Sequence, residues 1–449
     1  MNRDRVTRQS MLRHHEECLE LTGDESNFLA KGGTVMFNRK EMKRSVLVGG
    51  LALLGCLLTV SLILLPGSAQ ARNIKVGIID CYSGPAAVYG NDALNGFKLA
   101  LVDINKKGVL GGKIEWTKRD TKFKVDLALN MAKELVMREK VDVIVGTINS
   151  GAAMAVSEAI AKKEKVPFIT WISKSERITG EKGHRYVFSC GENTAMAGKA
   201  GGVALSKKPY VKYWIAGDDY EYGHAIANAA WRNLKAMKPD VQKIGESWWK
   251  PGEPDLVPYI TAILAAKPDA VIFCTGGRSM TNIMKAVKAT GMAEKVPIWI
   301  HTATDHAVLK PLGAEAPEGV MGTMDYHFYY PDTAANKEFV KKFEAAYGQA
   351  PGFPAFHGYI TAYFIAGAYK KAGSLDKEKF IDALEGMKIE SPVGQIEMRA
   401  CDHQVVLPMY LGITKKEVGK NIVISTNIVT LSGAEVMPTC DEIKKARGN

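Results

Sequence analysis

Short runs of β-branched residues alternate with stretches of helical periodicity throughout the chain after Arg72. The first run, Ile74 to Ile79, precedes a segment in which Leu94, Phe97 and Leu101 recur at the spacing of one helix face. Such alternation is typical of βαβ units, in which helices connect the strands of a parallel sheet. The sequence therefore predicts an α/β fold.

The alternation falls into two consecutive series, and each predicts its own sheet. The 378 residues after position 71 exceed the size at which one core stops growing. We therefore expect two doubly wound, Rossmann-like lobes, with a ligand cleft beyond the carboxyl ends of their strands. The expected strands are 74–79, 114–119, 141–145 and 167–170 in the first series, and 211–216, 241–248, 270–274 and 297–300 in the second.

The first 71 residues predict an export signal. We assign no function to the polar stretch 1–35, which has the character of a mis-called start. In 36–71, two basic residues precede a long apolar run, and Ala69 and Ala71 form an A-x-A cleavage site, as in a signal peptide. We therefore expect a periplasmic protein, with a retained membrane anchor or a lipid on Cys56 as the alternatives.

Charge and motifs exclude several classes of protein. Lys and Arg number 59 against 48 Asp and Glu, but the basic residues are scattered pairs, so we expect no nucleic-acid partner. No G-x-S-x-G, H-E-x-x-H, Walker or G-x-G-x-x-G motif occurs where it would signal catalysis or a nucleotide cofactor. We therefore predict a protein that is not an enzyme and has no cofactor.

Five cysteines follow the leader, and their spacing includes no C-x-x-C pair or Cys/His cluster, so no metal site is expected. In an oxidising compartment, Cys401 and Cys440 would close a loop near the C-terminus. The alternative is two separate thiols, and we favour the disulfide.

One loop offers a polar group for a ligand. Ser150 lies between a predicted strand and a predicted helix, where its hydroxyl and the free backbone N–H groups would hold a carboxylate. The alternative is that Ser150 only caps its own helix, which the residues by themselves favour.

Several segments together resemble a known family. SGPAAVYG, NGFKLALVDINKKGVLGGKI, VDVIVGTINSGAAMAVSEAIAKKEKVPFIT, GDDYEYG, KPDAVIF and RACDHQVVLPMY follow one another in this order. The series is similar to the Leu/Ile/Val-type solute-binding proteins of ABC importers, over essentially the whole chain after the leader.

The resemblance implies a type I periplasmic binding protein, in which two lobes joined by three crossings close on a small ligand without chemistry. It implies an ABC permease and its ATPase as partners, and we expect a monomer. The crossings should fall near Phe188, Thr323 and His403. Lobe 1 would then comprise 72–188 and 325–403, and lobe 2 would comprise 189–324 and 404–449.

The resemblance also implies ligand contacts. Tyr89 and Tyr222 match aromatic residues that line the cleft from the two lobes, and Ser150 matches a serine that holds the ligand carboxylate, which reverses the preference for a cap. In the next loop, Lys174 stands where the family has a threonine. Further candidates from the same loop and from a later helix are Trp171, Ser173 and Phe356.

The second lobe departs from the family pattern. Arg278 follows a Gly-Gly pair where the family has tyrosine, and Thr302 replaces the acidic residue that receives the ligand ammonium, with Asp305 three residues on. The substitutions favour a carboxylate ligand without an amine. If Arg278 faces solvent and Asp305 receives the ammonium, the ligand is an amino acid, so both remain open. A ligand-sensing domain of a signalling system is the alternative function.

Overall fold

The computed structural model describes residues 72–417, 419 and 421–448. The predicted extension 1–35 and signal peptide 36–71, with Cys56 and the Ala71 cleavage site, lie outside the described residues. Within these residues, no helix has the length and apolar character needed to cross a membrane.

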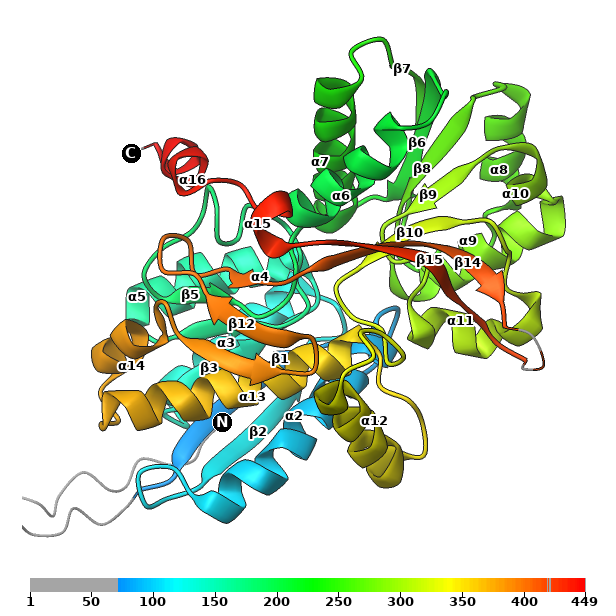
Figure 1. Cartoon of the computed structure of the whole chain (residues 1–449). Coiled ribbons are helices and arrows are strands. Elements are labelled where there is room, and N and C mark those ends of the chain that lie inside the picture. Colours follow the sequence, from blue (N-terminus) through cyan, green and yellow to red (C-terminus); the bar gives the residue numbers. More distant parts are fainter. Residues whose placement is uncertain (1–71, 418, 420, 449) are drawn as a thin grey trace, which may run out of the picture. The chain divides into compact units, whose positions relative to one another are not determined.

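The first sheet confirms the parallel arrangement expected from the first series (Figure 1). Its order is β2-β1-β3-β4-β5, and every neighbouring pair is parallel. The strands are β1 (Ile74–Asp80), β2 (Ile114–Asp120), β3 (Val143–Gly146), β4 (Phe168–Thr170) and β5 (Val187–Ser189).

The second sheet contains the second series and adds an antiparallel edge that the sequence pattern did not indicate. Its order is β15-β14-β10-β9-β8-β6-β7. The strands are β6 (Lys212–Asp218), β7 (Gln242–Trp249), β8 (Ala270–Cys274), β9 (Ile298–Ile300), β10 (Met321–Met324), β14 (Met409–Lys416) and β15 (Val423–Leu431). β14 pairs antiparallel with β10 on one side and with β15 on the other.

Helices cover both faces of each sheet (Figure 1). They are α2 (Ala87–Lys107), α3 (Val125–Met137), α4 (Ser150–Val156), which continues through a π-helical turn into α5 (Lys162–Glu164), α6 (Thr194–Ser206), α7 (Glu221–Met237), α8 (Val257–Ala265), α9 (Gly277–Thr290), α10 (Met292–Lys295), α11 (His306–Leu312), α12 (Ala334–Tyr347), α13 (Phe353–Ala372), α14 (Lys377–Leu384), α15 (Gly433–Val436) and α16 (Cys440–Arg447). A small antiparallel sheet of β11 (Lys388–Ser391), β12 (Gly394–Met398) and β13 (Val405–Val406) follows α14.

Alternate residues of β1 show how the first sheet is buried on both faces. Val76 and Ile78 belong to one core cluster with residues of α2 and α13, whereas Ile79 belongs to another with residues of α3 and α4. The long helices α2 and α13 lie backbone to backbone, because a Cβ at Gly96 would stand 1.8 Å from the Ala355 oxygen. This close packing fixes the N-terminal end of α13 beside the carboxyl end of the first sheet.

The same hydrogen-bonded arrangement ends the first strand of each series. Asp80 closes β1 and accepts hydrogen bonds from the Trp171 indole at 2.5 Å and the Ile148 backbone N–H at 2.9 Å. Asp218 closes β6 and accepts from the Trp249 indole at 3.0 Å and the Thr275 hydroxyl at 2.7 Å. Burial raises the pKa of both carboxyl groups to about 6, and these donors oppose that rise. Through these hydrogen bonds, the two aspartates hold the loops that face the cleft in place.

The chain passes between the two halves three times, after β5, after β10 and after β13. The first and third crossings touch, because the Ser189 N–H donates to the His403 oxygen at 2.9 Å and Ser189 forms a parallel bridge with Gln404. The Gln404 amide donates to the Gly191 oxygen at 2.6 Å. The fold class expected from the sequence is confirmed, and the residue limits of the lobes stay a prediction.

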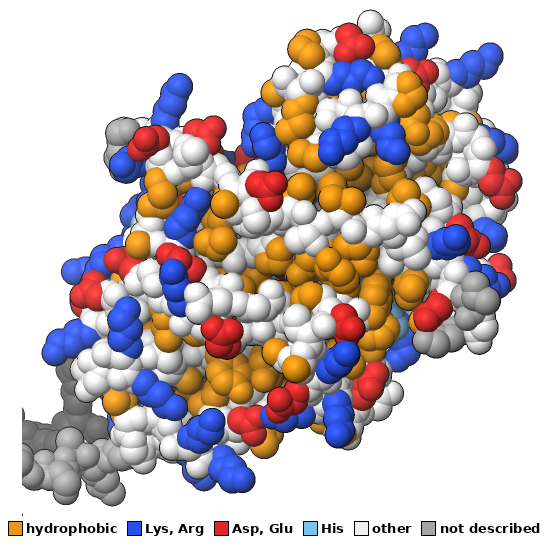
Figure 2. All heavy atoms as spheres, in the orientation of Figure 1, with side chains coloured by type: hydrophobic (Ala, Val, Ile, Leu, Met, Phe, Trp, Pro, Cys, Tyr) orange, Lys and Arg blue, Asp and Glu red, His pale blue; other side chains and the backbone are white. Residues whose placement is uncertain are grey.

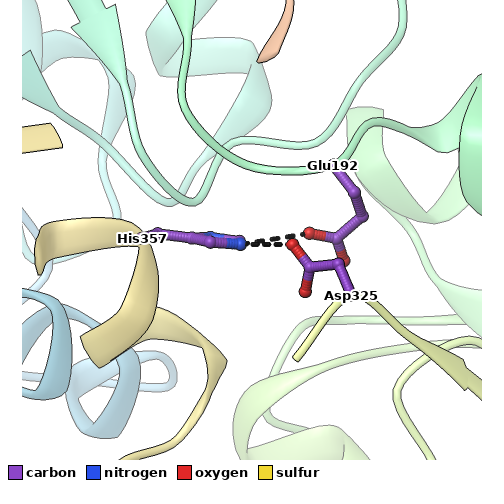
Figure 3. Close-up of side chains that lie close together, drawn as sticks. All are labelled: Glu192, Asp325 and His357. Carbon is purple, nitrogen blue, oxygen red and sulfur yellow. Dashed lines mark hydrogen bonds and ion pairs between the residues drawn. The ribbon is translucent and has the colours of Figure 1, made fainter. Parts of the chain in front are cut away.

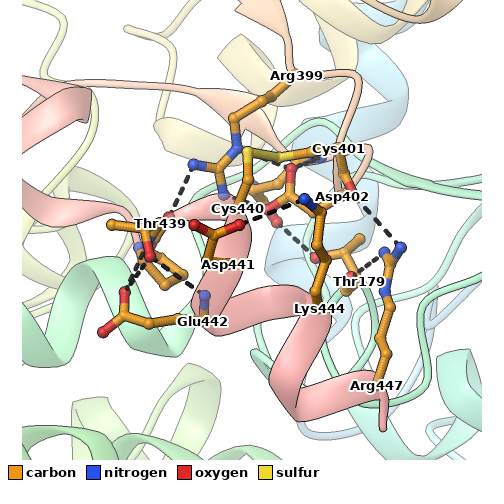
Figure 4. Close-up of a disulfide and its surroundings, with 12 residues drawn as sticks. Thr179, Arg399, Cys401, Asp402, Thr439, Cys440, Asp441, Glu442, Lys444 and Arg447 are labelled. Atoms are coloured by element: carbon orange, nitrogen blue, oxygen red, sulfur yellow. Dashed lines mark hydrogen bonds and ion pairs between the residues drawn. A yellow bond between two sulfur atoms is a disulfide. The ribbon is translucent and has the colours of Figure 1, made fainter. Parts of the chain in front are cut away.

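The predicted disulfide joins Cys401 to Cys440, with 5.9 Å between the Cα atoms, and confirms the favoured alternative (Figure 4). It ties α16 to the segment just before the third crossing. Arg447, at the end of α16, donates to the Thr179 oxygen at 2.7 Å and the Cys401 oxygen at 3.3 Å. The C-terminal helix is therefore held beside the hinge by a covalent bond and by hydrogen bonds from its last turn.

Candidate functional site

A cavity lies between the carboxyl ends of the two sheets. Its walls come from both halves of the protein: the segments that follow β1 to β4 and β6 to β9, and the N-terminal end of α13. On the face shown in Figure 2, Lys and Arg alternate with Asp and Glu, while hydrophobic side chains gather near the middle of the face.

The two halves touch around the cavity. The Arg278 backbone N–H donates to the Pro85 oxygen at 3.0 Å. On another side, the Ser175 hydroxyl donates to the Glu221 carboxylate at 2.7 Å, and the Phe123 and Tyr220 rings lie 5.4 Å apart. Contacts of this kind across the cleft are those of a closed conformation.

Aromatic rings make up much of the cavity wall. The Tyr89 ring lies 5.2 Å from Phe353, and the Tyr220 ring lies 5.9 Å from Tyr222. With Phe123, these five aromatic residues line the cavity from both halves of the protein. Rings on several sides suit a flat apolar body in the ligand.

Lys174 is the one cationic side chain among the described residues that line the cavity. It is only 5% exposed, and its ammonium lies 4.2 Å from the centre of the Phe353 ring. The same ammonium forms an ion pair with Glu192, which is fully buried. Lys174 has three N–H donors, so a ligand anion would share the ammonium with Glu192.

Glu192 connects Lys174 to two buried histidines. Its carboxylate lies 3.2 Å from His301 Nε2 and 3.4 Å from His357 Nε2. Burial opposes ionisation of Glu192, but the Lys174 charge and the histidines hold its pKa well below the usual range. His301 in turn lies 2.9 Å from the Tyr222 hydroxyl through Nδ1, so the network begins and ends at the cavity wall.

Asp325 completes this buried cluster, since its carboxylate lies 2.5 Å from His357 Nε2 (Figure 3). Glu192, Asp325 and His357 each offer an atom of a kind that binds divalent cations, and these atoms lie within 4.8 Å of one another. However, the Lys174 ammonium already pairs with Glu192, and a cation would have to break the hydrogen bond between His357 and Asp325. The arrangement is that of an ion-pair and proton network.

A second polar corner involves Asp305, which caps α11. One carboxylate oxygen accepts from the Ala307 N–H at 3.1 Å, and the other is buried without a partner among the described residues. Burial raises the pKa of Asp305 to about 7, while the hydrogen bond from the Ala307 N–H opposes the rise. The buried hydroxyls of Tyr89 and Thr302 also have no partner of their own. This corner has hydrogen-bonding capacity left for a ligand.

The predicted site residues divide into two groups. Those that line the cavity are Tyr89, Lys174, Tyr222 and Thr302. Those that do not line it are Ser150, Trp171, Ser173, Arg278, Asp305 and Phe356.

Three residues of the second group, Ser150, Trp171 and Ser173, hold the loops behind the cavity wall. Ser150 accepts from the Lys174 and Ser175 N–H groups at 3.3 Å, and Asn149, not Ser150, caps α4. Ser173 donates to the Thr147 oxygen. The Trp171 indole donates a hydrogen bond to the Asp80 carboxylate. These contacts position the backbone that carries Lys174.

The remaining two residues of this group lie apart. The Phe356 ring is fully buried and stacks on Tyr326 at 4.8 Å. The Arg278 side chain is exposed, and only its backbone N–H takes part in the contact with Pro85.

Sequence reasoning missed Glu192 and Asp325, which each follow a crossing, and His301 among the ion-pair residues. It also missed Phe123, Tyr220 and Phe353 on the wall. No spacing pattern links Glu192 with Asp325 or His357, because they meet only where the crossings meet α13. Of these residues, only Tyr220 could have been found from the sequence, because it lies in the same short stretch as Tyr222.

Gly277 tests whether closure matters for binding. Its φ is +57°, and a Cβ there would stand 2.7 Å from the Pro85 oxygen of the other half. Gly277→Ala is therefore expected to weaken ligand affinity about tenfold or more, because the closed contact is obstructed and the backbone is strained.

The matched control for Gly277→Ala is Gly319→Ala. Gly319 has a φ of +82° but no atom within 4 Å of the Cβ position. Calorimetric titration measures both affinities, and small-angle scattering measures compaction on ligand addition. Equal affinities for the two variants would show that the contact with Pro85 does not limit closure.

The family model of the periplasmic binding proteins matches residues 73–417. The chain belongs to this family. A periplasmic binding protein is a solute-binding receptor, and the closed cavity between two lobes is the site expected of such a receptor.

Relatives extend the family match. A Leu/Ile/Val-binding protein of Rhizobium johnstonii is 26% identical over 331 residues, which cover 72% of this chain and 87% of that protein. The structure of an ABC-transporter solute-binding protein of Rhodopseudomonas palustris in complex with 3,4-dihydroxybenzoic acid is 27% identical, with a TM-score of 0.74, and covers 80% of this periplasmic binding protein and 98% of that chain. A periplasmic binding protein of Burkholderia mallei, 23% identical with a TM-score of 0.76 over 83% and 98% of the two chains, has the same fold.

Proposed function

We propose that this protein is a periplasmic, non-enzymatic receptor that binds an aromatic carboxylate and delivers it to the permease and ATPase of an ABC importer. The leader 36–71 would export it, and it would act as a monomer. Tyr89, Lys174, Tyr222 and Thr302 would contact the ligand. Ligand binding would stabilise the closed state in a pre-existing equilibrium between open and closed forms.

The observation that carries the proposal is the single ammonium of Lys174 in a cavity walled by five aromatic residues. A ligand carboxylate would receive a charge-assisted hydrogen bond from Lys174, while its ring packs between Tyr222 and Phe353. The relative that was solved with 3,4-dihydroxybenzoic acid supports this ligand class.

The polar corner refines the ligand class. The Tyr89 and Thr302 hydroxyls and the free Asp305 oxygen are buried and have no partner among the described residues. Such groups favour a ligand that brings its own donor, because an unpaired buried polar group costs about 1–3 kcal/mol. A hydroxyl group on the ring would fill this need.

An amino acid is the second candidate, favoured by the same Asp305. In this alternative the ligand ammonium bonds to the Asp305 carboxylate, and the ligand carboxylate bonds to Lys174. The Leu/Ile/Val-binding relatives support it.

The two candidates are separated by thermal unfolding of the purified protein with a panel of leucine, isoleucine, phenylalanine, benzoate, 4-hydroxybenzoate and 3,4-dihydroxybenzoate. A ligand at a thousand times its Kd adds about 4 kcal/mol to the free energy of unfolding. We expect midpoint shifts with the hydroxybenzoates and none with the amino acids. A shift with leucine or phenylalanine alone would favour the second candidate, and no shift with any compound would contradict both.

A further inference from the structure

The buried cluster behind Lys174 has more carboxyl groups than lysine or arginine charges. Lys174 contributes one positive charge, whereas there are two carboxyl groups: Glu192 lies against His301 and His357, and Asp325 lies against His357. The side chains of Glu192, His301, His357 and Asp325 are all fully buried. Because solvent does not reach these side chains, an excess of negative charge among them favours the uptake of a proton.

The groups that face this cluster come from every element around it. They are Lys174 after β4, Glu192 before α6, Tyr222 on α7, His301 after β9, Asp305 at the start of α11, Asp325 after β10, His357 on α13 and Tyr410 on β14. Among these groups, Lys174 is the only lysine or arginine. A second negative charge brought to Lys174 therefore meets no further fixed positive charge.

The Asp325–His357 pair has a place for the proton. Asp325 Oδ2 is bonded to His357, whereas Asp325 Oδ1 is buried and has no partner among the described residues. Burial and the nearby Glu192 charge raise the pKa of Asp325 to about 6, and His357 opposes this rise. Since the two groups share a hydrogen bond, the proton belongs to the pair.

We propose that binding of an anionic solute to this protein is coupled to the uptake of one proton by the Asp325–His357 pair. This inference rests on the proposed function, because it requires a ligand carboxylate at Lys174. The carboxylate shares the ammonium with Glu192, so less of the positive charge compensates the cluster, and the pair takes a proton from solvent. The coupling joins the cavity to the first two crossings, since Glu192 follows β5 and Asp325 follows β10.

Because ligand binding and protonation of the pair are thermodynamically linked, the ligand affinity depends on pH. A ligand that raises the pKa of the pair binds more tightly when the pair is protonated. Affinity is therefore constant well below pH 6 and falls as the pH rises above it, until the pKa of the bound form is passed. Between pH 6 and pH 8 we expect the affinity for 3,4-dihydroxybenzoate to fall about threefold to tenfold.

The test is calorimetric titration of the purified protein with 3,4-dihydroxybenzoate at pH 7 in phosphate, imidazole and Tris buffers. The slope of the observed enthalpy against the ionisation enthalpy of the buffer gives the number of protons taken up. We expect about 0.5–1 proton per ligand in the wild-type protein. Asp325→Asn, which keeps an oxygen acceptor for His357, should bring the slope close to zero.

Two further variants keep the test decisive. Asp92→Asn is the matched control, because burial raises the pKa of Asp92 to about 7 at a position outside the cluster, and proton uptake should persist. Glu192→Gln frees Lys174, so it should tighten binding at pH 8 and reduce the uptake even if Asp325→Asn does not fold.

The outcomes are distinguishable. Binding without proton uptake would overturn the inference and leave the proposed function intact. Uptake that persists in Asp325→Asn and disappears in Asp305→Asn would assign the proton to the α11 corner and would also overturn it. Absence of binding by every carboxylate of the panel would overturn the proposed function, and the inference with it.

Discussion

Replacing both Cys401 and Cys440 by serine is expected to lower the free energy of unfolding by about 4 kcal/mol. The disulfide closes a loop with a sequence separation of 39, so its loss increases the entropy of the unfolded chain. Urea denaturation monitored by fluorescence measures the change as a lower midpoint.

A reducing agent supplies the control for this result. The wild-type protein in reducing buffer should unfold at the midpoint of the double variant, and the double variant should not respond to the same buffer. The hydrogen bonds of Arg447 to Thr179 and Cys401 remain in both, so they do not contribute to the difference. An unchanged midpoint in the double variant would show that those contacts alone hold α16.

Replacing Lys174 by methionine is expected to lower affinity for an aromatic carboxylate at least a hundredfold, because the ligand loses the cation that would compensate its charge. The same change leaves Glu192 buried without its main partner, and removing one member of a buried pair costs about 3–5 kcal/mol of folding free energy. Calorimetric titration measures the first effect, and denaturation without ligand measures the second.

The double variant Lys174→Met/Glu192→Gln separates stability from binding. Removing both charges should restore much of the stability, since Glu192 is no longer a buried charge without its partner, but it should not restore binding. Arg278→Ala is the second control, because that side chain is exposed and does not line the cavity, and its affinity should stay within about twofold of wild type. Recovery of affinity in the double variant, or a large loss in Arg278→Ala, would contradict the role assigned to Lys174.

The inner parallel strands could be predicted because both of their faces are buried, which makes them short apolar runs between amphipathic helices. Of these, β1, β3 and β4 lie within a residue or two of the expected ranges. By contrast, β14 and β15 include polar residues, and the antiparallel pairing of β14 with β10 depends on where the chain crosses the hinge. The local periodicity of hydrophobic residues does not show whether a strand pairs parallel or antiparallel with its neighbour.

The candidate site was predictable only in part. Lys174 and Thr302 lie in loops that follow predicted strands, and Tyr89 and Tyr222 lie in the first turns of the helices that come next, where a parallel sheet gathers its ligand contacts. Arg278 lies in such a turn as well, but a single residue at a helix start can point either into the cleft or away from it. Its exposure depends on the closed contact between Gly277 and Pro85, which involves both halves of the protein.

The sequence by itself determined the α/β class, the two series of strands, the turns that face the cleft and the favoured pairing of Cys401 with Cys440, because these follow from local periodicity, chain length and cysteine number. The tertiary structure alone decided the partner of Lys174. Glu192, His357 and Asp325 are far apart in the chain and come together only where two crossings meet α13. How much of the Lys174 charge is available to a ligand depends on this cluster, because nearby carboxylates compensate the charge of a buried ammonium.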